Sequence, residues 1–93
     1  MEKCITIEEI QSSWSEIITD VKETNDLTEL FTVAWLRPLT PCLLDGETLV
    51  VETLNDATKG YIGKRFKAKL ETSVKNIVGI NVNIVFCTME EAN

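Results

Sequence analysis

Few side chains in this sequence could take part in catalysis near neutral pH. The chain contains no histidine, so it lacks the side chain that most often activates a serine or cysteine nucleophile. Ser12, Ser13 and Ser15 surround Trp14 without a general base among their neighbours. No GxxxxGK[ST] phosphate-binding loop occurs, and the carboxylates fall at helix positions that we expect to be exposed. We therefore predict that the protein is not an enzyme.

The cysteines are the remaining reactive side chains. Cys4, Cys42 and Cys87 are odd in number and widely spaced, and no CxxC pair occurs. Without histidine, this pattern predicts neither a zinc site nor a disulfide framework. We expect reduced thiols in a cytosolic protein, with Cys42 and Cys87 partly buried, and we predict no metal and no cofactor.

The tetrapeptide at residues 60–63 fits the GXXG pattern, a short motif of some nucleic-acid-binding proteins. KH domains clamp a nucleic-acid backbone with such a loop between two helices. Here both glycines fall inside a predicted helix, which favours a structural use over a clamp. Lys64, Arg65 and Lys67 follow directly and could make weak, salt-sensitive contacts with single-stranded DNA. A stand-alone KH-like protein that binds single-stranded nucleic acid or regulates replication is therefore the alternative function.

Charge is divided unevenly along the chain, whose net charge is −6. Residues 1–29 carry eight acids and two lysines, a local charge of −6. Residues 59–78 carry six basic residues and one glutamate, a local charge of +5. Such a division favours oriented association with partners over general nucleic-acid binding. Two solvated faces without a partner would give the same pattern.

Two amphipathic helices are predicted in the first part of the chain. The first starts with a capping box at residues 6–9, and apolar residues then recur every three or four positions until about Lys22. An N-cap at Asp26 opens the second helix. This helix should close near Leu36, because Pro38 lacks an amide hydrogen and disfavours helical geometry in the residue before it.

A β-hairpin is predicted next. Asp45-Gly46 lies between the apolar pair at residues 43–44 and the alternating run at residues 48–53. A DG dipeptide between apolar runs is a strong hairpin signal, and we expect both residues to occupy turn positions with positive φ.

A third helix and a last strand complete the chain. Asn55 can cap a helix over about residues 57–78, and Gly79 can end it in a left-handed conformation. Residues 80–86 alternate apolar with mostly polar side chains, as in a half-buried strand.

The predicted order is helix, helix, strand, strand, helix, strand, within one domain spanning residues 1–93. We expect its core at about residues 6–87 and a frayed tail at residues 88–93. Three strands with helices packed on one face predict a two-layer α/β (α+β) fold. The last strand could pair with either hairpin strand. No apolar run reaches the roughly 18 residues that a membrane span needs.

The two tryptophans, Trp14 and Trp35, each fall on the apolar stripe of a predicted helix. This placement is typical of core residues. Tryptophan is also enriched at protein interfaces and is rarely buried completely, so an interface role for at least one of them stays open.

In this order and spacing, the motifs resemble the N-terminal domain (domain I) of DnaA, the bacterial chromosomal replication initiator. The likeness covers about residues 8–87. It is carried by the first-helix tryptophan, the WLRPL end of the second helix, the hairpin and the closing strand: Trp14, Trp35-Leu36-Arg37-Pro38-Leu39, Asp45-Gly46, Thr48-Leu49, Val51, Asn55, Tyr61-Ile62, Phe66, Gly79 and residues 82–86.

This resemblance implies a KH-like fold and a protein–protein interaction module for DNA replication initiation. Its partners would be other initiator molecules (oligomerisation), the replicative helicase (helicase loading) and small regulator proteins, in the cytoplasm at the nucleoid. The ATPase and DNA-binding domains that follow in the family are missing here. The chain is then either an excised domain or a stand-alone relative that modulates an initiator.

The resemblance also implies site residues. Trp14, with Ile17 on the same face, would mediate self-association, although Ser13 replaces a leucine found in some members. Phe31 lies one residue further from Trp35 than the helicase-contacting aromatic of some members. The remaining partner-binding positions lie around the hairpin asparagine and the following helix. The full expected partner-binding set is Phe31, Ala34, Trp35, Asn55, Ala57, Thr58 and Tyr61.

Overall fold

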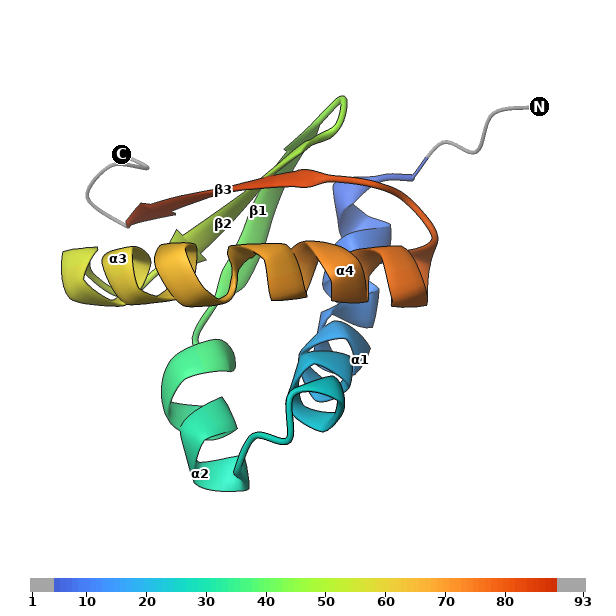
Figure 1. Cartoon of the computed structure of the whole chain (residues 1–93). Helices are drawn as coiled ribbons and strands as arrows, with labels where there is room; N and C mark the ends of the chain where they lie inside the picture. Colours follow the sequence, from blue (N-terminus) through green and yellow to red (C-terminus); the bar gives the residue numbers. More distant parts are fainter. Residues whose placement is uncertain (1–4, 89–93) are drawn as a thin grey trace.

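The computed structural model describes residues 5–88 (Figure 1). The elements in chain order are α1 (Ile7–Thr24), α2 (Glu29–Phe31), the π-helical turn η1 (Thr32–Leu36), β1 (Thr40–Asp45), β2 (Thr48–Thr53), α3 (Asp56–Arg65), α4 (Lys67–Val78) and β3 (Asn83–Thr88). The strands form one three-stranded sheet. The predicted small α+β fold is therefore confirmed.

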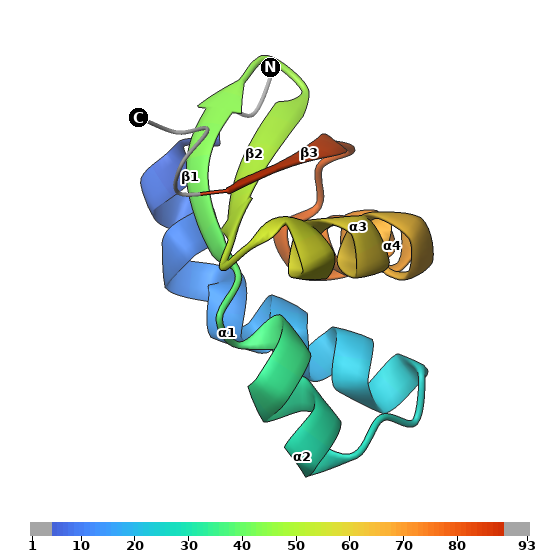
Figure 2. The same cartoon turned by 90° about the vertical axis from the view of Figure 1, so that its left-hand side faces the viewer.

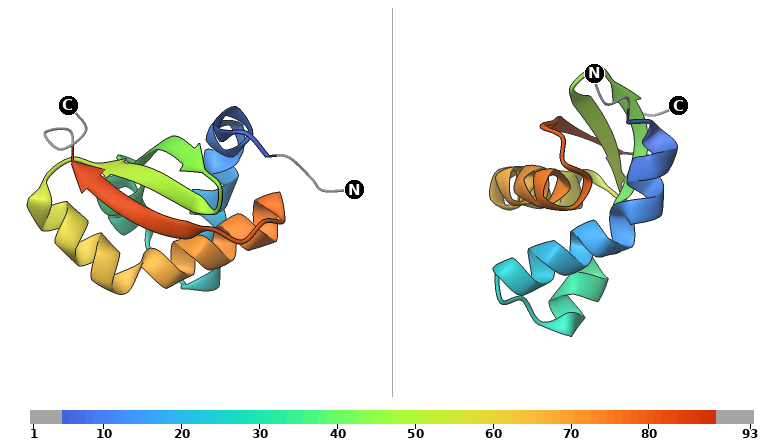
Figure 3. Two further views of the ribbon diagram at one scale, coloured as in Figure 1. Left: turned by 90° about the horizontal axis from the view of Figure 1, so that it is seen from above. Right: turned by 90° about the vertical axis from the view of Figure 1, so that its right-hand side faces the viewer.

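The sheet has the strand order β1-β2-β3. β2 is antiparallel to β1 and parallel to β3, so the last strand pairs with the second hairpin strand. Side chains alternate along the strands, and Leu49, Val51, Ile84 and Phe86 are buried. α3 and α4 run one after the other along β3 (Figure 3), whereas α1 packs against β1 and α4 (Figure 2).

Three predicted helix-terminal signals act as expected. The Thr6 hydroxyl accepts a hydrogen bond from the Glu9 amide (3.3 Å), and the Asn55 side chain accepts one from the Thr58 amide (2.9 Å). Gly79 ends α4 with a φ of 88°. Such caps satisfy amides and carbonyls that have no partner within the helix.

The start of the second helix was predicted wrongly. Asp26 has a positive φ of 54° in the connection after α1, so it is not the cap. Thr28 caps the helix instead, because its hydroxyl accepts a hydrogen bond from the Phe31 amide at 3.0 Å. Both residue types suit a cap, and the left-handed turn at Asp26 decides between them.

The single helix predicted over residues 57–78 is two helices. Phe66 leaves helical geometry, with φ −121° and ψ −5°. Its amide still donates to the Ile62 carbonyl, and its carbonyl accepts from the Leu70 amide, both at 2.8 Å. The break leaves the Phe66 ring 5% exposed. The ring keeps the buried position that the apolar pattern predicts, next to Ile62 and Leu70 of the core.

The hairpin turn is displaced by one residue from the predicted position. Asp45 pairs with Thr48, so the turn residues are Gly46 and Glu47. Within residues 5–88, the non-glycine residue with positive φ is Asp26, so only Gly46 (φ 61°) has it in this turn. A glycine at the first central position is typical of type II′ turns, which require one positive φ where type I′ turns require two.

Two further expectations need correction. Thr88, expected in the frayed tail, is the buried last residue of β3, while residues 89–93 lie outside the described residues, as does Cys4. Cys42 is exposed where burial was expected, because the β1–β2 register shifts between Pro41 and Leu43. Cys87 is partly buried, as expected.

Side chains from the helices bind backbone groups in the two outer strands. On β1, the Gln11 amide donates to the Pro41 carbonyl at 2.9 Å. On β3, the Glu71 carboxylate accepts a hydrogen bond from the Ile84 amide at 2.8 Å. These contacts tie α1 and α4 to the margins of the sheet.

Among the helices of residues 5–88, none combines the length and apolar character needed to cross a bilayer.

Candidate interaction surface

The tryptophan of α1 lies in the core. Trp14 is 8% exposed and Ile17 is fully buried. The Trp14 indole nitrogen donates a hydrogen bond to the Leu39 carbonyl at 3.1 Å, which ties α1 to the segment before β1. The expected self-association contact through Trp14 and Ile17 is therefore not available on the surface of this structure, because both side chains pack inside it.

Four aromatic rings connect α2 and η1 with α3 and the α3–α4 junction. We call them the aromatic cluster: Phe31, Trp35, Tyr61 and Phe66. The Trp35 and Tyr61 ring centroids lie 4.6 Å apart, and those of Phe31 and Phe66 lie 5.6 Å apart. Phe31 stacks on Trp35 at 6.1 Å with an interplanar angle of 27°. Such pairs contribute attraction beyond the area that they bury.

The π-helical turn η1 helps to place this cluster. The Arg37 amide donates to the Thr32 carbonyl, five residues back, at 3.0 Å. The buried Thr32 hydroxyl donates to the Thr28 carbonyl at 2.8 Å. A π turn holds more residues than an α-helical turn and is frequent at functional sites. With η1 in this form, Phe31 and Trp35 face the same side and stack.

A hollow of about 580 Å³ lies beside the aromatic cluster, and we call it the aromatic–basic hollow. It is bounded by the α2 segment on one side and by the junction of α3 and α4 on the other. Its apolar lining comes from a leucine and three rings of the cluster, and its basic lining comes from three cations. The lining residues are Leu27, Phe31, Tyr61, Phe66, Lys64, Arg65 and Lys69.

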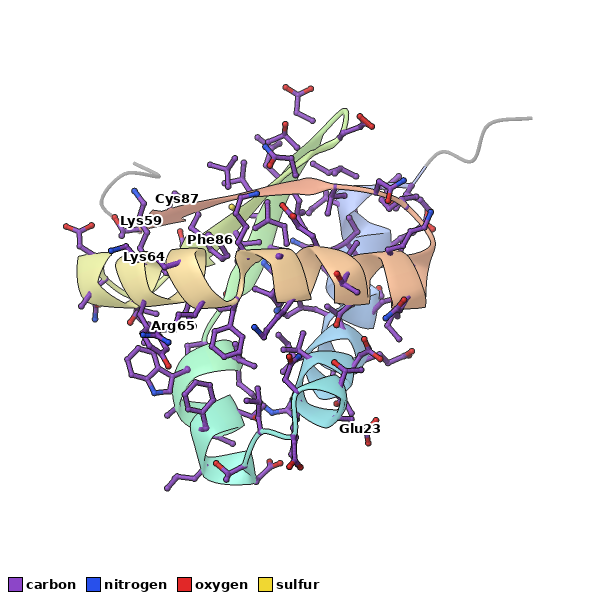
Figure 4. The ribbon with its side chains drawn as sticks, in the orientation of Figure 1. Glu23, Lys59, Lys64, Arg65, Phe86 and Cys87 are labelled. Atoms are coloured by element: carbon purple, nitrogen blue, oxygen red, sulfur yellow. The ribbon has the colours of Figure 1, made fainter. Side chains whose placement is uncertain are left out.

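The cations of the hollow contact its rings. The Arg65 guanidinium lies 5.6 Å from the Tyr61 ring centroid, on the side of α3 that faces α2 in Figure 4. The Lys69 ammonium lies 5.6 Å from the Phe66 centroid. Neither of these cations, nor Lys64, forms an ion pair with another of residues 5–88.

The residues expected to contact DNA do not share one surface. Lys64 and Arg65 line the hollow. Lys67 instead pairs with the Glu71 carboxylate and donates to the Asn83 side chain at 2.8 Å. The GXXG glycines at residues 60–63 lie inside α3, as the structural reading of these glycines predicted.

The expected partner-binding residues fall into three places. Phe31, Trp35 and Tyr61 belong to the aromatic cluster. Asn55 and Ala57 line a smaller hollow of about 380 Å³ at the start of α3, next to the half-buried Thr58. Ala34 is exposed on the outer side of η1.

Ala34 belongs to an exposed apolar stripe whose other two residues, Leu30 and Val33, the expected set left out. Leu30 is 80% exposed and Val33 is 49% exposed, and with Ala34 they occupy one face of α2 and η1 at helical spacing. We call Leu30, Val33 and Ala34 the apolar stripe. The opposite face of the same segment carries the buried Thr32 and Leu36.

Sequence reasoning also missed Phe66 and Lys69 as site residues. A usable signal was present, because Tyr61 and Arg65 are four residues apart, as are Arg65 and Lys69. Side chains at this spacing are neighbours on a helix surface. Leu27 could not be found in this way, since it reaches the hollow from another part of the chain.

One ion pair fixes the connection between α1 and α2. The Lys22 ammonium lies 2.6 Å from a carboxylate oxygen of Glu29. The hydrogen bond and charge of Lys22 lower the pKa of Glu29 below its ordinary value. Glu29 is otherwise exposed, so this pair is expected to be screened by salt.

No protein-family model matches the sequence. Within residues 5–88, no three His, Cys, Asp or Glu side chains are grouped in a way that could hold a metal ion.

Proposed function

We propose that the chain is a KH-like protein–protein interaction module of the DNA replication initiator type. It would support self-association of initiator molecules, recruitment of the replicative helicase and docking of regulators, in the cytoplasm at the nucleoid. The proposal is supported by the order of motifs along nearly the whole chain and by the order of helices and strands that these motifs predicted.

The apolar stripe next to the aromatic cluster is the observation that carries the proposal. Leu30 and Val33 leave apolar side chains in water on a short helical segment, and Trp35 is only partly buried in the same segment. Clustered exposed apolar residues, with aromatic residues beside them, are typical of protein interfaces.

The π turn η1 offers an explanation for one departure from the family. Phe31 lies one residue further from Trp35 than the corresponding aromatic in some initiators. A π-helical turn accommodates additional residues without breaking the helix, and here the two rings still stack. The longer spacing is therefore compatible with a partner contact at this segment.

Self-association is proposed through a different surface from the one expected. Trp14 is buried, so a second copy would contact the apolar stripe instead of the indole. The same stripe would then serve helicase contact, and the two partners would compete for it.

The test uses the purified chain, with the replicative helicase and the full-length initiator of the same organism. Binding is measured by biolayer interferometry and self-association by sedimentation velocity. Replacing the two larger stripe residues (Leu30→Ser with Val33→Ser) should weaken binding by about tenfold or more, because burial of each such side chain contributes about 1.5–3 kcal/mol. Leu43→Ser is the matched control, since Leu43 is 54% exposed in β1, outside the helical segment.

Two results would count against the proposal. One is a wild-type chain that binds neither protein and remains monomeric at high concentration. The other is an equal loss of binding in the stripe variant and in the Leu43→Ser control, since the contact would then not depend on the stripe.

Single-stranded nucleic-acid binding is the second candidate function. The unpaired cations Lys64, Arg65 and Lys69 beside aromatic rings favour it. A titration with single-stranded DNA at two salt concentrations tests it, because phosphate contacts weaken steeply with salt. Absence of binding at low salt would remove this candidate.

A further inference from the structure

We propose that the aromatic–basic hollow binds an acidic peptide segment of a partner protein, in which an apolar anchor side chain lies between carboxylates. This inference rests on the proposed function, because it assigns a partner chemistry to an interaction module. It concerns a different surface from the apolar stripe, so the two can be tested separately.

The charge of the hollow is the first argument. The whole chain carries a net charge of −6, yet Lys64, Arg65 and Lys69 gather at one hollow without an ion pair to any of residues 5–88. Lys22 and Lys67, by contrast, each pair with a carboxylate. Carboxylates of a partner protein would form ion pairs with these three cations and orient the partner as it approaches.

The lining of the hollow is the second argument. Leu27 and Phe31, which are partly exposed, supply apolar surface beside the cations. A volume of about 580 Å³ lies within the usual range of ligand pockets and can take one large side chain with its neighbours. A partner that offered charge alone would leave this apolar surface in water, so an apolar anchor is part of the expected ligand.

The ring faces favour a peptide over a nucleic acid. Single-stranded nucleic-acid binders stack bases on open aromatic faces. Here Tyr61 contacts Trp35 at 4.6 Å and Arg65 at 5.6 Å. Phe66 is 5% exposed and has Lys69 over its ring. Tyr61 and Phe66 are therefore already in contact with other side chains and less available for stacking, and the acidic remainder of the chain would repel a longer polyanion.

The acidic face of α1 in a second copy of this chain is a weaker candidate for the occupant. Four exposed acids lie on this helix (Glu8, Glu9, Glu16 and Glu23). The apolar side chains of α1 from Ile10 to Val21 are all buried, so the acidic face of this helix has no anchor to place in the hollow.

The experiment uses fluorescein-labelled peptides with a Leu-Phe pair flanked on both sides by glutamates. Comparison peptides replace the glutamates with glutamines, or the Leu-Phe pair with Ser-Ser, and an oligodeoxythymidine represents nucleic acid. Fluorescence anisotropy should show binding of the Glu/Leu-Phe peptide and about tenfold weaker binding of both comparison peptides. Amide shifts in ¹⁵N spectra should centre on residues 61–69 and on Leu27 and Phe31.

Charge variants localise the contact. Arg65→Gln and Lys69→Gln should each weaken peptide binding about threefold to fivefold, as expected for an exposed ion pair. Lys75→Gln is the matched control, because Lys75 is an exposed α4 cation outside the hollow. It should bind like the wild-type chain.

Several results would overturn the inference. They are absence of binding by the Glu/Leu-Phe peptide, equal binding of the glutamine peptide, amide shifts away from the hollow, and binding of the oligonucleotide alone. Failure of the proposed function and failure of the peptide site give different results. If the peptide binds the hollow but the helicase and initiator do not bind the chain, the site stands and the replication role falls. If both proteins bind and the peptide does not, the site falls.

Discussion

Whether Trp14 stabilises the fold or mediates association can be decided by Trp14→Phe. The indole is 8% exposed and its nitrogen donates to the Leu39 carbonyl at 3.1 Å. Phenylalanine keeps an aromatic ring at this position but has no donor. The substitution therefore leaves a buried carbonyl without its hydrogen-bond partner.

The expected loss of stability follows from two effects. An unsatisfied buried acceptor costs about 1–3 kcal/mol. The smaller ring leaves unfilled space, which adds about 1 kcal/mol, similar to the loss of one or two methylene groups from a core. Together these lower the free energy of unfolding by about 2–4 kcal/mol, which is a large share of the roughly 5–15 kcal/mol that stabilises a typical domain. The melting temperature should fall by about 10 °C or more.

The assay is thermal and urea unfolding followed by circular dichroism, with sedimentation velocity on the same samples. Ser15→Ala is the control, because Ser15 is exposed on α1 close to Trp14; it should change the free energy of unfolding by no more than about 0.5 kcal/mol and leave self-association unchanged. The reasoning is refuted if Trp14→Phe unfolds like the wild-type chain but self-associates less. In that case the indole would act at an interface.

Two further predictions concern local stability. Gly60 lies inside α3, and a Cβ added there would meet no atom within 4 Å. Gly60→Ala should therefore stabilise the fold by about 0.5–1 kcal/mol in urea unfolding, and a loss of stability would contradict the open environment. The Lys22–Glu29 pair should stabilise the fold above pH 4.5, the ordinary pKa of Glu29, and this contribution should disappear as the pH falls through its lowered pKa. Glu29→Gln should remove that part of the acid dependence of unfolding, and an unchanged pH profile would argue against the pair.

Local signals in the sequence predicted much of the fold. The caps at Thr6 and Asn55 and the terminator Gly79 depend on neighbouring residues only, so the sequence was sufficient to find them. The hairpin was also found, although the pairing of Asp45 with Thr48 moved its turn by one residue.

The errors arose where distant residues decide the local structure. The helical pattern continues through Phe66 and places its side chain correctly in the core, but it does not reveal the break in the backbone there. Trp14 lies on the apolar face of a predicted helix, and this position fits a core residue and an interface residue equally well. Its packing in the core, with a hydrogen bond to Leu39 from a segment 25 residues away, places it inside.

Only part of the candidate site was predicted, again because residues distant in the sequence form it. Phe31, Trp35 and Tyr61 were chosen individually, and the fold brings them together. The hollow also needs Leu27 and Lys69, which belong to segments on either side of it. The way in which three separate segments meet is a property of packing, and the order of motifs along the chain does not contain it.

The side-chain contacts at the sheet margins limit how this protein can assemble. An incoming strand would need free amides and carbonyls along an outer strand. On one margin Pro41 has no amide hydrogen and its carbonyl is already bonded to Gln11; on the other, the Ile84 amide is held by Glu71. At these two positions the outer strands cannot offer their usual backbone partners to an incoming strand, which disfavours growth of the sheet from copy to copy. Complexes should form through helical surfaces, where they can be reversible.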